Sequence, residues 1–170
     1  VREACKLFID NDIKTIAVSF IWSVLNPTHE IRAAQIIKEM IPDAIITIGS
    51  ELYPQIREYT RTSTAITNAY LSPILRNYVS AINEYFINLG GKNNVRYFQS
   101  NGGLATGKVM SERSVYAINS GPASAPQAGL SVCNPFDYKN IITVDMGGTS
   151  FDITLTKDGN TNLNKNIDFL

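Results

Sequence analysis

Apolar and polar positions near the start of the chain alternate between helix-like and strand-like segments. Residues 1–11 have the spacing of an amphipathic helix, and the β-branched apolar run at residues 15–20 predicts a buried strand. Asn26 followed by Pro27 predicts the start of a second helix, and AIITI at residues 44–48 predicts a second buried strand. Strand, helix and strand in this order predict two adjacent parallel strands with a right-handed crossover.

Helical spacing dominates the middle of the chain. Residues 54–89 predict a long helical layer with a break near Ser72 and Pro73, and the pair Gly90-Gly91 predicts its C-terminal cap. Helices and strands that alternate along a chain are typical of the α/β class, so we expect an α/β fold.

Shorter elements are predicted in the next part of the chain. Residues 95–99 predict a short strand, residues 100–103 a turn, and residues 111–119 an extended segment. Gly121 and Pro122 open a helix of small residues, ASAPQAGLSV, which suits close packing against a sheet or a ligand.

The segment NIITVDMGGTSFDITLT, residues 140–156, has the pattern of a β-hairpin. Gly147 and Gly148 separate two β-rich runs, and a two-residue primed turn needs the positive φ that glycine adopts at little cost. This turn predicts that Asp145 stands opposite Ser150. Side-chain alternation then divides the hairpin into two faces. The apolar face, which is expected to meet the core, carries Ile142, Val144, Phe151, Ile153 and Leu155.

The other face of the predicted hairpin is polar. It carries Thr143, Asp145, Ser150, Asp152 and Thr154. Asp145 and Asp152 are expected to lie diagonally across the hairpin, with their backbones roughly 7–8 Å apart. Two carboxylates, glycine amides open to an anion and the Thr149 hydroxyl suit a magnesium ion with a phosphate group. A tight turn with two solvated carboxylates is the alternative.

Composition excludes several classes of partner. Among the 170 residues, fifteen Lys and Arg balance fifteen Asp and Glu. No basic cluster lies beside aromatic residues, so neither nucleic acid nor an anionic membrane surface is expected as a partner. No apolar run reaches the roughly 18 residues of a membrane span. Cys5 and Cys133 are far apart, which is typical of reduced thiols in a cytoplasmic protein.

Other polar residues are expected to have structural roles. His29 is the only histidine, so the string HEIRA lacks the second histidine of a zinc HExxH site. His29 and Glu30 are expected to serve the start of their helix. Glu58, Arg61 and Asn68 fit pairing on a helix surface, with contacts in a functional site as the alternative.

DMGGTSFD closely resembles the DxGGT phosphate hairpin of the acetate and sugar kinase, Hsp70 and actin superfamily. Further stretches are similar, in order and spacing, to the hydantoinase A, 5-oxoprolinase and acetone carboxylase family, namely SFIWSVLNPTHEIRAAQII, SELYPQIREYTRTSTAITNAYLSP, QSNGGLA, NSGPA and VDMGGTSFDI. The resemblance implies ribonuclease-H-like, actin-like ATPase lobes with a mixed sheet and packed helices, present here incompletely. Residues 1–60 would end the first lobe, and residues 61–170 would begin the second with the hairpin at 140–156.

The same resemblance implies a site for ATP and Mg²⁺. Phosphate and metal contacts are implied for Asp145, Gly147, Gly148, Thr149 and Asp152, with the two aspartates at the metal. Gly121, Pro122 and Ala123 would lie on a helix near the nucleotide. Asn101, Gly102 and Gly103 either line the cleft or form a simple turn. Neither the motifs nor the resemblance identifies a catalytic residue.

Three functions are compatible with this resemblance. In the first, the complete protein is an ATP-dependent amidohydrolase that opens a hydantoin, 5-oxoproline or a similar cyclic amide after phosphorylation of the ring carbonyl oxygen. In the second, it is the ATP-using subunit of an acetone- or acetophenone-carboxylase complex. In the third, it is a nucleotide-binding lobe with no chemistry of its own.

The start of the chain and its single hairpin suggest an internal fragment. The chain begins at Val1, and the family's first phosphate hairpin, a GGTFTD-like string, is absent. We therefore expect residues 1–170 to be inactive alone. The resemblance also implies an oligomer and a hydantoinase B-like partner subunit for the complete protein.

Overall fold

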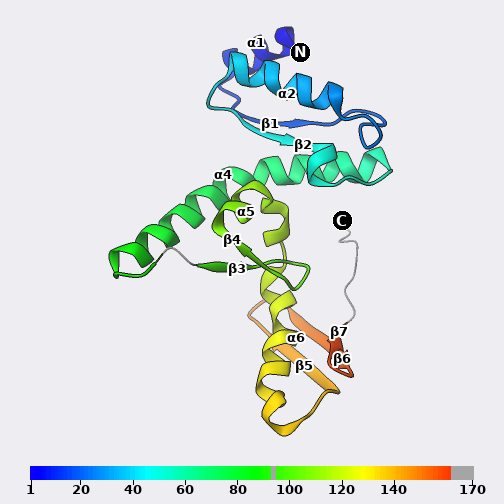
Figure 1. Cartoon of the computed structure of the whole chain (residues 1–170), viewed down its shortest axis with the longest axis vertical. Coiled ribbons are helices and arrows are strands. Elements are labelled where there is room, and N and C mark those ends of the chain that lie inside the picture. The colour runs from blue at the N-terminus through cyan, green and yellow to red at the C-terminus, as the bar shows by residue number, and fades with distance from the viewer. Residues whose placement is uncertain (93–94, 162–170) are drawn as a thin grey trace. The chain divides into compact units, whose positions relative to one another are not determined.

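The computed structural model describes residues 1–92 and 95–161 (Figure 1). The chain forms two compact units. Unit 1 comprises Val1–Val95 and Gly107–Val115, and unit 2 comprises Arg96–Thr106 and the chain from Tyr116 onward. Both units combine helices with small sheets, which confirms the α/β class.

The lobes predicted from the family resemblance do not have the same bounds as these two units. Assignment of residues 1–60 and 61–170 to two ribonuclease-H-like lobes stays a prediction, and residues 93–94 and 162–170 of the second range lie outside the described residues. In the part of the chain that the structure describes, no helix has both the length and the hydropathy needed to cross a membrane.

Unit 1 is built on a two-stranded parallel sheet. Strand β1, Thr15–Val18, pairs with β2, Ile45–Ile48, and helix α2, Thr28–Met40, connects them. The Asn26 side chain accepts a hydrogen bond from the Thr28 backbone N–H at 3.1 Å, as expected before a helix start. The predicted pair of adjacent parallel strands is confirmed.

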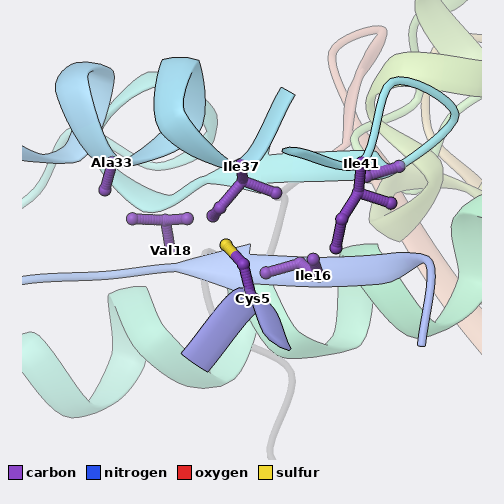
Figure 2. Close-up of a cluster of buried hydrophobic side chains, with 7 residues drawn as sticks. Cys5, Ile16, Val18, Ala33, Ile37 and Ile41 are labelled. Carbon is purple, nitrogen blue, oxygen red and sulfur yellow. The ribbon is translucent and has the colours of Figure 1, made fainter. Parts of the chain in front are cut away.

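The core of unit 1 lies between this sheet and the helices on one of its faces. Helix α1, Arg2–Asp10, packs beside α2. Ile16 of β1, Ile37 of α2 and Cys5 of α1 lie in one buried cluster (Figure 2). Burial of one such isoleucine contributes about 1.5–3 kcal/mol, so this cluster is a main source of stability in unit 1.

A long helix, α4 at Glu58–Asn88, covers the opposite face of the sheet (Figure 1). The predicted break at Ser72 and Pro73 is wrong, because the helix continues through both residues. The Ser72 hydroxyl donates a hydrogen bond to the Asn68 carbonyl at 2.7 Å. This carbonyl, one turn before the proline, therefore has a side-chain donor in addition to the backbone of the helix. Packing of α4 along the sheet outweighs the local effect of a proline.

The end of α4 is formed as predicted. Gly90 has a φ of 80°, which glycine adopts at little cost. The N–H groups of Gly90 and Gly91 donate to the carbonyls of Ile87 and Phe86, both at 2.9 Å, which is the Schellman pattern of a helix C-terminus. The predicted C-terminal cap is confirmed.

Short helical segments complete unit 1. Helix α3, Gly49–Leu52, follows β2, and helix α5, Gly107–Glu112, leads into the 3-10 turn η1, Ser114–Ala117, whose last two residues belong to unit 2. The extended segment predicted at residues 111–119 is therefore wrong. The buried Asn68 side chain accepts the Val115 N–H at 3.0 Å, and this tertiary contact holds the segment in its turn.

Unit 2 contains two antiparallel sheets and one main helix. Its elements are β3 Arg96–Phe98, β4 Leu104–Thr106, α6 Ser120–Cys133, the 3-10 turn η2 Asn134–Phe136, β5 Ile141–Met146, β6 Phe151–Lys157 and β7 Asn160–Thr161. β3 pairs with β4, and β5, β6 and β7 form the second sheet in that order. The short strand, the turn at residues 100–103 and the small-residue helix are confirmed.

Helix α6 packs closely on the β5–β6 sheet. A Cβ atom added at Gly129 would lie 2.6 Å from Thr143 Oγ1 and 3.1 Å from Ile141 Cδ1. No side chain fits in that space, so glycine at residue 129 permits the helix to approach the strand. The predicted close packing of this helix against a sheet is confirmed.

Candidate functional site

The β5–β6 hairpin has a longer loop than predicted. Asp145 pairs directly with Asp152, and residues 147–150 form the loop. The Gly147 N–H donates to the Ser150 carbonyl at 3.0 Å and closes it. The predicted pairing of Asp145 with Ser150 is therefore wrong.

The two glycines lie in the turn, as predicted, but not for the predicted reason. Neither Gly147 nor Gly148 has a φ in the left-handed region. A loop of four residues reverses the chain with ordinary φ values, whereas a two-residue primed turn needs positive ones. A Cβ atom at Gly148 would meet nothing within 4 Å, so this glycine leaves its backbone open to solvent.

Two carboxylates face each other beside this loop. Asp145 and Asp152 are direct cross-strand partners, which places both side chains on one face, as predicted. Directly opposed Cβ atoms lie about 4.5–5.5 Å apart, closer than the diagonal arrangement that was predicted. The Ser150 hydroxyl donates to Asp152 Oδ2 at 3.2 Å. Two like charges at this separation repel each other, so a bound cation would stabilise the pair.

The described residues offer no cation of their own to these carboxylates. Within residues 1–92 and 95–161, neither Asp145 nor Asp152 forms an ion pair with a Lys or Arg side chain. The same part of the chain holds no group of three or more His, Cys, Asp or Glu that could bind a metal. Magnesium commonly takes one or two carboxylates and completes its shell with water and phosphate oxygens. The pair therefore fits a magnesium–phosphate group and does not fit a stand-alone metal site.

The prediction that the apolar face of the hairpin meets the core is wrong, because the structure covers the polar face and exposes the apolar one. The apolar side chains predicted to be buried are each more than half exposed, namely Ile142, Val144, Phe151, Ile153 and Leu155. Helix α6 packs instead on the polar face, where Gly129 lies against Thr143. Small side chains on both sides of that contact let the helix approach. Asp145 lies beyond the contact and remains exposed, and Asp152 is half-buried.

The N-terminus of α6 and the hairpin loop lie at the same end of unit 2. Figure 1 shows α6 and β5 running in opposite directions, and Gly129 lies level with Thr143. From Thr143 to Gly147 the strand rises about 13 Å. A helix covers the same distance in about nine residues, so counting back along α6 from Gly129 reaches Ser120. Gly121 therefore lies near the level of the loop.

The segment with Asn101, Gly102 and Gly103 joins this end of unit 2. The Ser100 N–H donates to the Tyr116 carbonyl at 2.7 Å, just before α6 begins. The Asn101 side chain accepts the Gly103 N–H at 2.9 Å, so it stabilises its own turn. The local structure is a simple turn, and its contact with a nucleotide stays a prediction.

A polar cluster that was not predicted lies at the carboxyl ends of β1 and β2. The buried Glu30 accepts the Phe20 N–H at 2.7 Å and the Ser50 N–H at 2.9 Å. Burial by itself raises the pKa of the Glu30 carboxyl, but the backbone hydrogen bonds from Ser50 and Phe20 hold that pKa below its ordinary value. Glu30 therefore joins two loops of unit 1 as a carboxylate, rather than serving only the start of its helix.

The predicted pairing on the helix is present for Glu58 and Arg61, but Arg61 and Asn68 are buried, so their predicted place on the surface is wrong. Arg61 donates to the carbonyls of Phe20 at 2.8 Å and Gln55 at 2.9 Å, and its guanidinium lies 3.8 Å from the Glu58 carboxylate. A signal for this burial was available in the sequence. Arg61, Asn68 and Ser72 share one helical face with small residues, and an exposed face does not require small residues.

Comparison with known proteins gives a consistent set of similarities. The family described as Hydantoinase/oxoprolinase matches residues 61–169, and the Hydantoinase/oxoprolinase N-terminal region matches residues 1–41. The chain is 56% identical over its whole length to caprolactamase subunit alpha of Pseudomonas jessenii, of which it covers 24%. It is 32% identical over 94% of its length to 5-oxoprolinase of Saccharomyces cerevisiae, of which it covers 12%.

A solved structure is similar as well. The nucleotide-free structure of acetone carboxylase, from a study of ATP-dependent acetone carboxylation, superposes with a TM-score of 0.79 at 30% identity. The match covers 93% of this chain and 22% of that one. The chain thus spans a quarter or less of the length of the relatives that it matches.

Proposed function

Because the chain belongs to the hydantoinase/oxoprolinase family, we propose that it is the phosphate-binding part of an ATP-dependent amidohydrolase. The observation that carries the proposal is the hairpin, where Asp145 and Asp152 oppose each other beside an exposed glycine loop. On this proposal, residues 1–60 end one ribonuclease-H-like lobe of an actin-like ATPase fold, and residues 61–170 begin the second.

The residues of the hairpin have separate roles in this proposal. Asp145 and Asp152 hold magnesium, and the loop offers backbone N–H groups from Gly147, Gly148 and Thr149 to phosphate oxygens. Gly121 at the N-terminus of α6 adds the positive end of a helix dipole at the same end of the unit. The turn formed by residues 101–103 lines the nucleotide cleft.

ATP would supply the phosphoryl group, and its transfer to the carbonyl oxygen of a cyclic amide would release ADP. The phosphorylated lactam is a better electrophile for water, whose addition is followed by cleavage of the ring C–N bond and release of phosphate. Phosphoryl transfer is accelerated mainly by positioning and by neutralisation of charge, and the hairpin contributes both. No residue of this chain is assigned as nucleophile.

The proposed substrate is a lactam or a related cyclic imide. Hydantoin and 5-oxoproline are candidates from the resemblance, and the 56% identity to caprolactamase subunit alpha supports adding caprolactam. That relative is named as a subunit, which supports a partner subunit. By the family resemblance, we propose that this partner is hydantoinase B-like and that the oligomer is cytoplasmic. The alternative is the ATP-using subunit of a ketone carboxylase, which the likeness to acetone carboxylase supports.

The test uses the complete gene product with its co-purified partner. Substrate-stimulated release of ADP is measured with caprolactam, hydantoin and 5-oxoproline, and with acetone and acetophenone in bicarbonate. Stimulation by a cyclic amide supports the hydrolase, and stimulation only by a ketone with bicarbonate supports the carboxylase. ATP binding with no stimulated turnover supports a lobe without chemistry.

One substitution then tests the hairpin. Asp145→Asn removes a charge near magnesium with little change of volume, and we expect turnover to fall by about 100-fold or more. Asp137→Asn is the control, because Asp137 is an exposed aspartate of the same unit, and asparagine tolerates its φ of 55°. Wild-type turnover by the Asp145→Asn protein would show that the hairpin is structural.

A further inference from the structure

The segments that follow β1 and β2 leave the unit 1 sheet at the same end. β1 ends at Val18 and β2 at Ile48, and the two strands are parallel. Residues 19–27 follow the first strand, and residues 49–57 follow the second. Ligands of open α/β sheets bind outside the carboxyl ends of the strands, so this end is where unit 1 would hold a ligand.

Two buried side chains of opposite charge fix both segments from within. The Phe20 N–H donates to Glu30 at 2.7 Å, and the Phe20 carbonyl accepts from Arg61 at 2.8 Å. The same side chains hold the second segment, because Glu30 accepts the Ser50 N–H and Arg61 donates to the Gln55 carbonyl. Glu30 and Arg61 are both fully buried. The two segments therefore form one fixed face, as a pre-organised binding site requires.

Each segment holds one large residue in an unfavourable backbone conformation. Trp22 has a φ of 56° and Arg57 a φ of 92°, both in the left-handed region. Such residues are uncommon, and they gather at ligand sites. Next to Trp22, the buried Ser23 hydroxyl has no hydrogen-bond partner among the described residues, and the same holds for the Ser50 hydroxyl. Strain and unpaired polar groups together indicate that function, rather than stability alone, determines this face.

The outer surface of this face combines an apolar ring with a carboxylate. Trp22 is 55% exposed and its neighbour Ile21 75% exposed. The Glu58 carboxylate accepts the Trp22 N–H at 3.4 Å and lies 3.8 Å from the Arg61 guanidinium. Hydrogen bonds from its own backbone N–H and from that of Trp22 lower the pKa of the Glu58 carboxyl. The Glu58 side chain stays 43% exposed, so an anionic acceptor is open to a ligand beside the indole.

A small cyclic amide matches both features. Its ring has an apolar face that an indole can cover, and its N–H can donate to a carboxylate. A phosphate or another anion is repelled by Glu58. An adenine ring shares the flat face and the N–H donor, so the experiment below has to separate the amide from ATP.

We propose that Trp22 and Glu58 bind the cyclic amide substrate, with the indole against the ring and the Glu58 carboxylate accepting the ring N–H. The inference rests on the amidohydrolase function proposed above and adds residues that hold the substrate. Phosphorylation of the carbonyl oxygen places positive charge on the ring nitrogen. The same carboxylate would then stabilise the phosphorylated ring more strongly than the free amide.

Substitutions of Trp22 test the contact with the ring. The complete gene product with its co-purified partner is assayed for ADP release, with whichever of caprolactam, hydantoin and 5-oxoproline stimulates the wild type most. We expect Trp22→Leu to raise the KM for this amide at least about fivefold, and Trp22→Phe, which keeps an aromatic face, to raise it less than about twofold. Both variants carry the same backbone strain, so their comparison isolates the ring. The KM for ATP should stay unchanged in both.

Tyr85→Leu is the matched control. Tyr85 is an aromatic residue of similar exposure, 61%, and lies about 40 Å from Glu58 along α4. Neither KM should change in this variant.

A change in the substrate tests Glu58. The wild type should bind the amide more tightly than its N-methylated derivative, which has no N–H to donate. Glu58→Ala should reduce this preference at least about fivefold, because the two changes remove the same hydrogen bond. A purely structural role of Glu58 would weaken both ligands equally and leave the preference unchanged.

The outcomes separate this inference from the proposed function. If no cyclic amide stimulates ADP release by the wild type, the amidohydrolase function fails and this inference fails with it. If an amide stimulates release but its KM is unchanged in Trp22→Leu, or rises equally in Trp22→Phe, only this inference is overturned. An increase in the KM for ATP alone would assign the face to the nucleotide. Loss of the partner subunit with unchanged KM would assign it to a subunit interface, and either result overturns the inference.

Discussion

Replacement of Glu30 by glutamine should destabilise unit 1 although it changes only one atom of the side chain. The carboxylate accepts two backbone hydrogen bonds, from Phe20 at 2.7 Å and from Ser50 at 2.9 Å. Glutamine keeps one acceptor oxygen and turns an amide NH₂ toward the other N–H. One charge-assisted hydrogen bond is then lost and one buried donor is left unpaired.

The size of this effect follows from the same contacts. A hydrogen bond to a charged group contributes about 1.5–3 kcal/mol, and an unpaired buried donor costs about 1–3 kcal/mol. These two figures partly describe the same loss, so we expect the free energy of unfolding to fall by about 2–4 kcal/mol. A domain has about 5–15 kcal/mol in total, so the Glu30→Gln unit should unfold at a clearly lower urea concentration.

Trp22 provides the assay. It is the only tryptophan of the chain and lies two residues after Phe20, in the loop that Glu30 holds. Urea unfolding is therefore followed by its fluorescence. Glu39→Gln is the matched control, because Glu39 lies on the same helix and forms exposed ion pairs with Arg2 at 3.1 Å and Arg32 at 3.3 Å. Exposed pairs contribute about 0–1 kcal/mol, so the control should unfold near the wild-type midpoint.

The comparison of these two variants can refute the reasoning. If Glu30→Gln and Glu39→Gln have the same midpoint, the two backbone contacts of Glu30 do not stabilise unit 1. If Glu30→Gln unfolds early but Trp22 fluorescence of the folded protein is unchanged, the contact stabilises the unit without shaping the loop.

Three further predictions concern pH, packing and activity. The pKa of Glu30 is lowered by folding, so its stabilisation is complete above the ordinary value of 4.5 and is lost as pH falls through the folded value. The difference in urea midpoint between wild type and Glu30→Gln should therefore shrink between pH 7 and pH 3, and a constant difference would contradict this. Gly129→Ala should cost about 1–3 kcal/mol in thermal unfolding of unit 2, since its Cβ atom would lie 2.6 Å from Thr143 Oγ1. Gly121→Ala meets nothing within 4 Å and should be neutral or slightly stabilising. Residues 1–170 alone should open no hydantoin or 5-oxoproline above background with ATP, measured by chromatography, because a single phosphate hairpin leaves ATP incompletely positioned.

Local patterns in the sequence determined the elements whose causes are local. Two apolar, β-branched runs on either side of a helical segment identified the parallel pair β1 and β2, and two glycines identified the Schellman cap after α4. Alternation also placed Asp145 and Asp152 on one face of the hairpin. This prediction is correct although the predicted loop length is wrong. The observed register differs from the predicted one by two residues, and a shift of two residues keeps every side chain on its face.

Tertiary contacts decided the rest. Helix α4 continues through Pro73 because it packs along a sheet, and Glu30 is buried because two loops from separate strands supply its hydrogen-bond donors. The pattern of the hairpin showed that its faces differ, but it did not show which face α6 would cover. Helix α6 covers the polar face because Gly129 permits close approach to Thr143 there. These residues are 14 positions apart, and neither segment specifies their contact alone.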